Sequence, residues 1–182
     1  YMKQIIPTTI LLLAFCLVVF AQNEIKDGDL VISNNFLDAQ RKDLRGKTFR
    51  IGERTSKYKI LLVWATWSGP CLIVLEQLSK VSQELEKYNA KIFGLIPTEK
   101  ENQNKDLRDA KKYTKRFKTK FTNSLIIEEA IGEIMDKLKV KGIPLMILIN
   151  EDGKILKHFV GSNYRHFDRL KAELEKLSTA NK

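Results

Sequence analysis

Three uninterrupted apolar runs stand out along the chain. Each is bounded by polar residues and is too short for a typical helix, which favours strands that are buried on both faces of a sheet. The runs occupy residues 59–64 and 91–96, each of which starts with a lysine that precedes the apolar residues, and residues 145–149. We expect Pro97 to close the second strand.

Shorter patterns add two further strands. Arg45-Gly46-Lys47 is typical of a turn and precedes a predicted strand at 48–51. Residues 151–154 read Glu-Asp-Gly-Lys, which predicts a hairpin turn leading into an antiparallel strand at 155–160.

Apolar residues at helical spacing predict four helices between and after these strands. The first begins at Pro70 and ends near Asn89, because proline suits the first turn of a helix. The apolar face of the first helix contains Cys71, Val74, Leu75, Leu78, Val81 and Leu85, and that of the second contains Leu107, Ala110, Tyr113 or Thr114, and Phe117. The third helix has Ile131, Ile134, Met135 and Leu138 on its apolar face, and the last has Phe167, Leu170, Leu174 and Leu177.

The order of these elements predicts an α/β fold. A helix joins the first two buried strands, which should therefore be parallel through a right-handed crossover, whereas the hairpin is antiparallel. A central mixed β-sheet flanked by helices on both faces follows from this order.

The first residues predict export. Lys3 precedes the apolar run 10–21, which is shorter than the roughly 20 residues that a spanning helix needs. We expect a signal peptide at 1–21, cleaved between Ala21 and Gln22, a polar lead-in segment at 22–35 and one domain at 36–182. An uncleaved N-terminal anchor is the alternative.

Cysteine usage limits the redox chemistry. The chain contains two cysteines, Cys16 in the apolar run and Cys71. If the signal is removed, Cys71 is the only thiol, so any disulfide must join two molecules. With His158 and His166 as the only histidines, we expect no metal site and no cofactor.

The net charge of +10 allows contact with an anionic envelope surface. The basic residues gather between 105 and 120, although Asp106 and Asp109 dilute them, and a solvated helix face is the simpler interpretation. We expect no nucleic-acid partner and a monomeric protein.

The motif that carries chemistry is Trp67-Ser68-Gly69-Pro70-Cys71, directly after the first buried strand. It resembles the thioredoxin turn Trp-Cys-Gly-Pro-Cys with serine in place of the first cysteine. Lys141-Gly142-Ile143-Pro144 before a later strand is a second matching signature, and with 149–155 it resembles the TlpA/ResA group of envelope thiol-disulfide oxidoreductases over roughly residues 36–178. The resemblance implies a thioredoxin fold, a periplasmic or envelope location, and a cis Ile143–Pro144 bond facing the turn.

The departures from this family pattern concern catalysis. The family needs an attacking thiolate where this chain has Ser68, and Cys71 matches the second, resolving cysteine, which is shielded from solvent. Positions where relatives carry an acid hold Leu62 and Val74, and Leu145 replaces a frequent threonine. No histidine is near in sequence to activate a serine, so we expect Ser68 to be a helix N-cap.

These observations favour a binding module without dithiol redox turnover. Its groove for a protein or peptide partner would comprise Trp67, the Gly69-Pro70 turn and Ile143-Pro144. Two alternatives stay open: a monothiol protein that uses Cys71, and a reductase whose native residue 68 is cysteine. Whether the chain is an enzyme is therefore left open.

Overall fold

The three apolar runs form neighbouring strands at the centre of one sheet. A computed structural model describes residues 28–180, and the predicted signal peptide lies outside the described residues. The central strands are β3 (Tyr58–Val63), β4 (Ala90–Thr98) and β6 (Leu145–Asn150). Every residue of β3 is buried, as expected for a strand covered on both faces.

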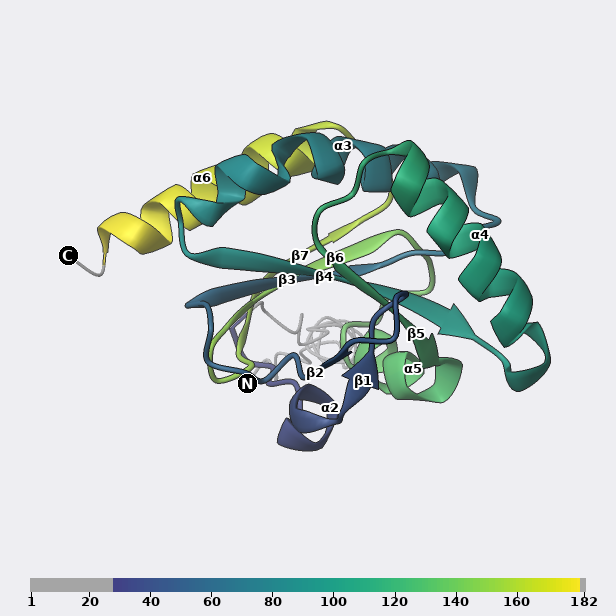
Figure 1. Cartoon of the computed structure of the whole chain (residues 1–182). Helices are drawn as coiled ribbons and strands as arrows, with labels where there is room; N and C mark the ends of the chain where they lie inside the picture. Colours follow the sequence, from purple (N-terminus) through teal and green to yellow (C-terminus); the bar gives the residue numbers. More distant parts are fainter. Residues whose placement is uncertain (1–27, 181–182) are drawn as a thin grey trace, which may run out of the picture.

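The sheet is mixed and has five strands in the order β5-β4-β3-β6-β7 (Figure 1). Its edges are β5 (Thr122–Ile127) and β7 (Ile155–Val160). β3 and β4 are parallel, as are β4 and β5, whereas β6 is antiparallel to both β3 and β7. The predicted crossover and hairpin are therefore confirmed.

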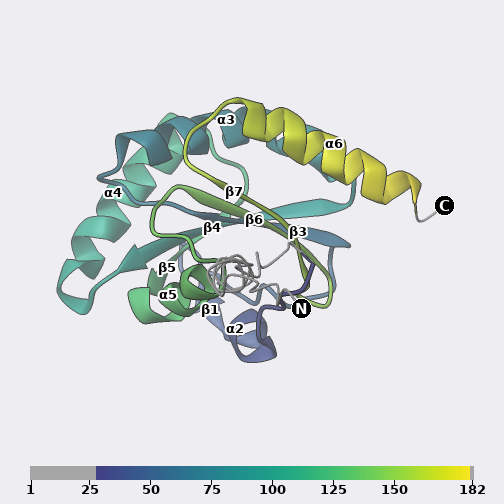
Figure 2. The same cartoon turned by 180° about the vertical axis from the view of Figure 1, so that it is seen from behind.

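Helices cover both faces of the sheet, as the sequence predicted (Figures 1 and 2). The first face carries α3 (Gly69–Glu86), α4 (Gln103–Arg116) and α6 (Arg165–Thr179). The second face carries α2 (Asn34–Asp38), α5 (Glu128–Lys137) and the small antiparallel pair β1 (Arg41–Lys42) and β2 (Thr48–Phe49). A short 3-10 turn, η1 (Lys100–Asn102), precedes α4.

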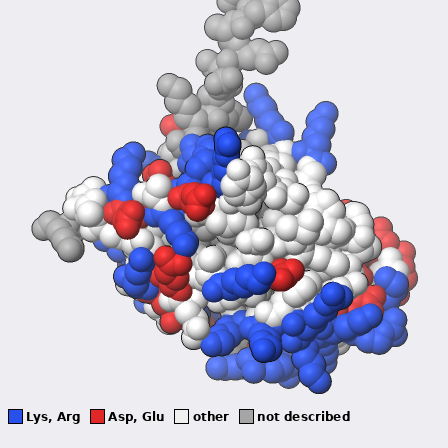
Figure 3. Space-filling model, turned by 90° about the horizontal axis from the view of Figure 1, so that it is seen from above, with Lys and Arg blue, Asp and Glu red and all other residues white. Residues whose placement is uncertain are grey.

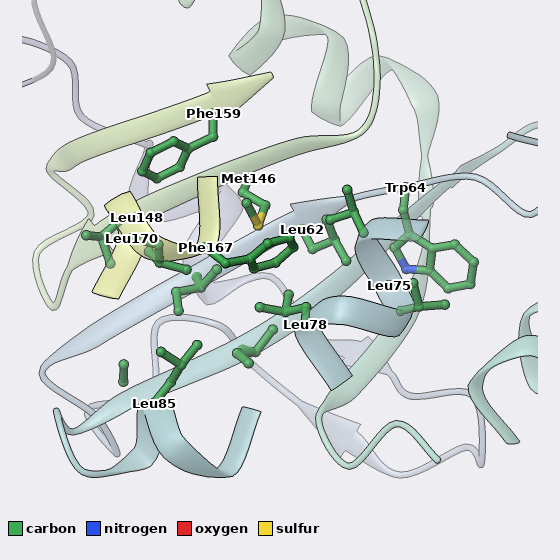
Figure 4. Close-up of a cluster of buried hydrophobic side chains, with 14 of the residues drawn as sticks. Leu62, Trp64, Leu75, Leu78, Leu85, Met146, Leu148, Phe159, Phe167 and Leu170 are labelled. Carbon is green, nitrogen blue, oxygen red and sulfur yellow. The ribbon is translucent and has the colours of Figure 1, made fainter. Parts of the chain in front are cut away.

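Each face of the sheet has its own hydrophobic core, because side chains alternate across a strand. Leu62 of β3 and Trp64, directly after the strand, point to the first face, where they meet α3 and α6 (Figure 4). From the same strand, Leu61 and Val63 point to the second face, where Ile131 of α5 packs. The turn that follows β3 is thus anchored by buried residues on both sides.

Two predictions about strands were wrong. The sequence analysis missed β5, whose mixed residues Thr-Asn-Ser-Leu-Ile-Ile lack a continuous apolar run because it is an edge strand. β4 also continues through Pro97 instead of ending before it. Its pairing with β3 stops at Leu95, so the missing N–H of Pro97 removes no bond to β3.

The segments before β3 also differ from expectation. The predicted strand at 48–51 is reduced to β2, and its partner β1 was not predicted. Within the described part of the lead-in segment, Ile32 is buried and Val31 bridges to Lys154. The Leu30 carbonyl also accepts a hydrogen bond from the backbone N–H of Ile155, so the lead-in packs on the domain from residue 30. Across residues 28–180, no helix has the length and apolar character needed to span a membrane.

Candidate functional site

The motif turn connects the end of β3 to the start of α3. Ser68 is the N-cap of α3 and has an extended backbone. Its Oγ accepts a hydrogen bond from the backbone N–H of Cys71 at 3.4 Å. This bond satisfies one of the free donors at the helix start, which confirms the predicted capping role. Pro70 occupies the first turn, where its missing N–H costs nothing.

Cys71 is the free cysteine of the described chain and is completely buried. Burial raises the pKa of the Cys71 thiol, and hydrogen bonds with the Ser68 side chain and the Ala65 backbone offset this only in part. Because the thiolate is the reactive form, the raised pKa and the lack of access both reduce reactivity. The predicted shielding of this residue is confirmed.

The Gly-Ile-Pro loop lies beside the turn. Ile143–Pro144 is a cis peptide bond, as predicted. Val63 and Leu145 are paired across β3 and β6, so the residues that follow Val63 and those that precede Leu145 meet at one sheet end. The backbone N–H of Gly161 donates to the Pro144 carbonyl at 2.8 Å and ties the loop after β7 to the same end.

The predicted groove residues divide into two groups. Trp67 is 75% exposed and shares with Ile143 a groove of about 620 Å³. Gly69 and Pro70 are exposed on the helix start but are not among the residues that line this groove, and Pro144 is buried. The structure thus brings Trp67 and Ile143 together, with Ser68 and Cys71 beneath the turn.

The acidic residues that line the groove were not predicted. They are Glu99, Asp106, Glu128 and Asp136, and they lie just after β4, in α4 and in α5. These residues are dispersed in sequence, and Asp106 was noted only as a break in a basic run. No local motif could have revealed them, because the β-sheet and α5 assemble them.

Exposed apolar side chains occur mainly around the turn. Among the described residues, six large hydrophobic side chains are exposed. Trp67 and Ile73 belong to the turn and the start of α3, Val160 ends β7, and Tyr164 lies in the loop that follows β7. An exposed apolar set rimmed by polar residues is typical of a protein-binding surface.

The two positions at which the family resemblance implies an acid hold aliphatic side chains. Leu62 is completely buried and Val74 is 1% exposed, and both pack in the first-face core with Cys71. Neither can exchange a proton with the thiol. Within residues 28–180, no group of three or more His, Cys, Asp and Glu side chains is arranged to hold a metal ion.

A second surface is strongly basic. Lys and Arg side chains gather over α4, at the lower right of Figure 3. A hollow of about 700 Å³ between α4 and the turn before β2 is lined by Arg45, Lys111, Lys115 and Lys120. The three lysines take part in no ion pair within the described chain, so their charges are free to attract anions.

Known proteins resemble the chain along most of its length. The model of the redoxin family matches residues 26–175. An uncharacterized protein of Haemophilus influenzae is 28% identical over 84% of this chain and 88% of its own length. The thiol-disulfide oxidoreductase ResA of Halalkalibacterium halodurans is 24% identical over 66% of this chain and 63% of its own length. A secreted disulfide oxidoreductase of Mycobacterium tuberculosis superimposes with a TM-score of 0.59 and 18% identity, covering 79% and 99% of the two chains.

Proposed function

Since this chain belongs to the redoxin family and is similar to the TlpA/ResA thiol-disulfide oxidoreductases, we propose that it is an exported thioredoxin-like protein that binds a partner without dithiol turnover. Its Ser-Gly-Pro-Cys turn would keep the binding surface of the family and lack the redox step. The partner is a protein or peptide held beside Trp67, with Gly69, Pro70, Ile143 and Pro144 shaping the surface.

The observation that carries the proposal is that position 68 holds a serine while the thiol of Cys71 is buried. Dithiol exchange needs an exposed thiolate to attack and a second thiol to resolve the mixed disulfide. At position 68 a hydroxyl caps α3, and Cys71, three residues further along the chain, is completely buried. The turn therefore has one inaccessible thiol where the reaction needs two, one of them exposed.

A disulfide-reductase assay beside a Ser68→Cys variant tests this proposal. The protein with Ser68 should show no turnover above the rate of free dithiol. Ser68→Cys should form a reversible internal disulfide with Cys71 but turn over slowly, because Leu62 and Val74 offer no acid to move the proton. Turnover by the Ser68 protein comparable to that of the variant would refute the proposal.

Export is the second part of the proposal. It is supported by the short apolar run 10–21 and by similarity to a secreted oxidoreductase and to ResA. Intact-mass measurement on protein from its native host should give a mature chain that begins at Gln22. A mass that still includes the apolar run would support an anchor instead.

We further propose that the basic surface of α4 contacts an anionic envelope surface. Sedimentation with vesicles that contain anionic lipid should show binding that weakens as salt is raised, because exposed charges are screened. Lys111→Gln together with Lys115→Gln should reduce the bound fraction. Equal binding to neutral vesicles would argue against this contact.

A further inference from the structure

We propose that the groove beside Trp67 selects an extended peptide segment in which an apolar side chain is flanked by Lys or Arg. The inference rests on the binding function proposed above and adds the chemistry of the partner. It follows from the shape of the groove, its apolar wall and the sign of its charges.

The groove beside Trp67 is continuous with a second hollow. The hollow beside Trp67, of about 620 Å³, adjoins a second hollow of about 560 Å³. The two share Thr98, Glu99, Glu128 and Gly132, so together they run from the turn along the space between the end of β4 and the start of α5. A strand-like peptide could occupy both hollows.

One wall of the hollow beside Trp67 is apolar. Trp67 contributes an indole that is 75% exposed, and Ile143 contributes a half-buried side chain from the loop before β6. Ile131 and Met135 extend the wall from α5. Covering this surface with an apolar side chain removes it from water, and methionine adapts easily to different partners.

The charges of the groove oppose those of the whole molecule. The chain carries a net charge of +10, yet carboxylates outnumber ammonium groups around the groove. The cations that line the two hollows are Lys100 and Lys141. The acidic residues that line them are Glu99, Glu101, Asp106, Glu128, Glu129 and Asp136.

The carboxylates of the groove are not neutralised by neighbours. Within residues 28–180, none of these acidic side chains takes part in an ion pair, although eight ion pairs occur elsewhere on the surface. Glu99 accepts a hydrogen bond from the Asn102 amide at 3.1 Å. Several unpaired negative charges in one groove raise the local concentration of cations, so a cationic partner is favoured.

Asp106 gives the inner wall a fixed negative group. It is 8% exposed, and its Oδ2 accepts a hydrogen bond from the Thr98 hydroxyl at 2.6 Å. This bond fixes the carboxylate against the end of β4, where it lines the hollow with Trp67. A carboxylate that is held in one position orients a bound partner. It also loses less conformational entropy on binding than a mobile, exposed side chain does.

A peptide fits this groove better than a metal ion does. Within the described residues, the carboxylates do not converge into a group that could hold a metal. They are instead distributed along two adjoining hollows, beside an exposed indole that can stack on Lys or Arg. Spaced carboxylates next to an apolar wall match a peptide that carries cationic and apolar side chains together.

Fluorescence anisotropy with labelled peptides tests the inference on the full domain. The probe is a nonapeptide of alternating Lys and Leu, compared with the same peptide carrying Glu in place of Lys. We expect the Lys peptide to bind at least tenfold more tightly at 50 mM salt, and the difference to shrink at 300 mM.

Matched variants separate charge from apolar contact. The double variant Glu128→Gln with Asp136→Asn should bind the Lys peptide about tenfold more weakly, which corresponds to ~1.4 kcal/mol of binding free energy. Glu86→Gln with Glu173→Gln, outside the groove, removes the same net charge and should change affinity less than twofold. Circular dichroism melts of both double variants check that the fold is retained.

The outcomes distinguish this inference from the binding function itself. Trp67→Ala should lower the affinity of the protein for both peptides if the groove is the binding site. If Trp67→Ala has this effect but the two double variants behave alike, the groove binds without charge selection and the inference is overturned. If neither peptide binds the protein that carries Trp67, both the inference and the binding function fail.

Discussion

Ser68 and Cys71 together set what the turn can do. The hydroxyl of Ser68 accepts the backbone N–H of Cys71, so the residue in the position of the attacking thiol stabilises the helix instead. Cys71 packs with Val74 and Leu75 in the first-face core and behaves as a small apolar residue. The five-residue turn therefore holds a helix cap at position 68 and a buried thiol at position 71.

Alkylation of Cys71 should be slow in the folded protein. Its raised pKa means that, at any given pH near 8, the folded state holds a smaller thiolate fraction than the unfolded state does. We expect reaction with iodoacetamide to be at least a hundredfold slower in buffer than in denaturant, and its rate to rise at higher pH in the folded protein. Mass spectrometry gives the rates. Rapid labelling of native protein at neutral pH would instead favour the monothiol alternative.

At the scale of elements, close contact between β4 and β5 supports the turn. The indole Nε1 of Trp64 donates to the Asn123 Oδ1 at 3.1 Å, and the Asn123 amide donates to the Phe121 carbonyl at 3.0 Å. Gly94 lies beneath this bridge, and a Cβ at that position would overlap the Asn123 side chain. The absence of a side chain at 94 lets the buried bridge form between the strands.

Gly94→Ala should therefore destabilise the protein. Because the added methyl group would displace Asn123 and leave the buried Trp64 N–H without a partner, we expect a loss of ~2 kcal/mol in the free energy of unfolding. Urea denaturation measures it. The double variant Gly94→Ala with Asn123→Ala should lose less free energy of unfolding than the sum of the losses in the two single variants, since both substitutions remove the same bridge. Additive costs would show that the bridge does not cause the effect.

At the scale of the whole molecule, one sheet carries two cores. β3 contributes to both, with Leu62 on the face of α3 and α6 and Leu61 on the face of α5. The groove beside Trp67 lies at the sheet end where Trp67, the loop at Ile143 and α5 meet. Its shape thus depends on elements packed against opposite faces.

Leu61→Ala and Leu62→Ala should each lower stability by ~3 kcal/mol, because both side chains are completely buried. We expect each variant to unfold in one cooperative transition in which near-ultraviolet and far-ultraviolet circular dichroism coincide, since the two cores share β3. Ile73→Ala, at an exposed position of α3, is the matched control and should change stability little. Separate transitions for the two signals would mean that the faces unfold independently.

The sequence determined the central elements and the chemistry of the turn. Continuous apolar runs are a local signal, so β3, β4 and β6 could be predicted, as could the helix starting near Pro70 and the cap at Ser68. The resemblance carried by the motif supplied the cis bond at Pro144 and the shielding of Cys71. The edge strand β5 was missed because half-exposed edges need no continuous apolar run.

Only the tertiary structure decided the shape and charge of the groove. Glu99, Asp106, Glu128 and Asp136 are separated by up to 37 positions and belong to three different segments, so no spacing rule connects them. Pairing of β4 with β5 and packing of α5 on the second face bring them into the same groove as Trp67. Local patterns fix secondary structure and caps, whereas the assembly of distant carboxylates depends on long-range packing.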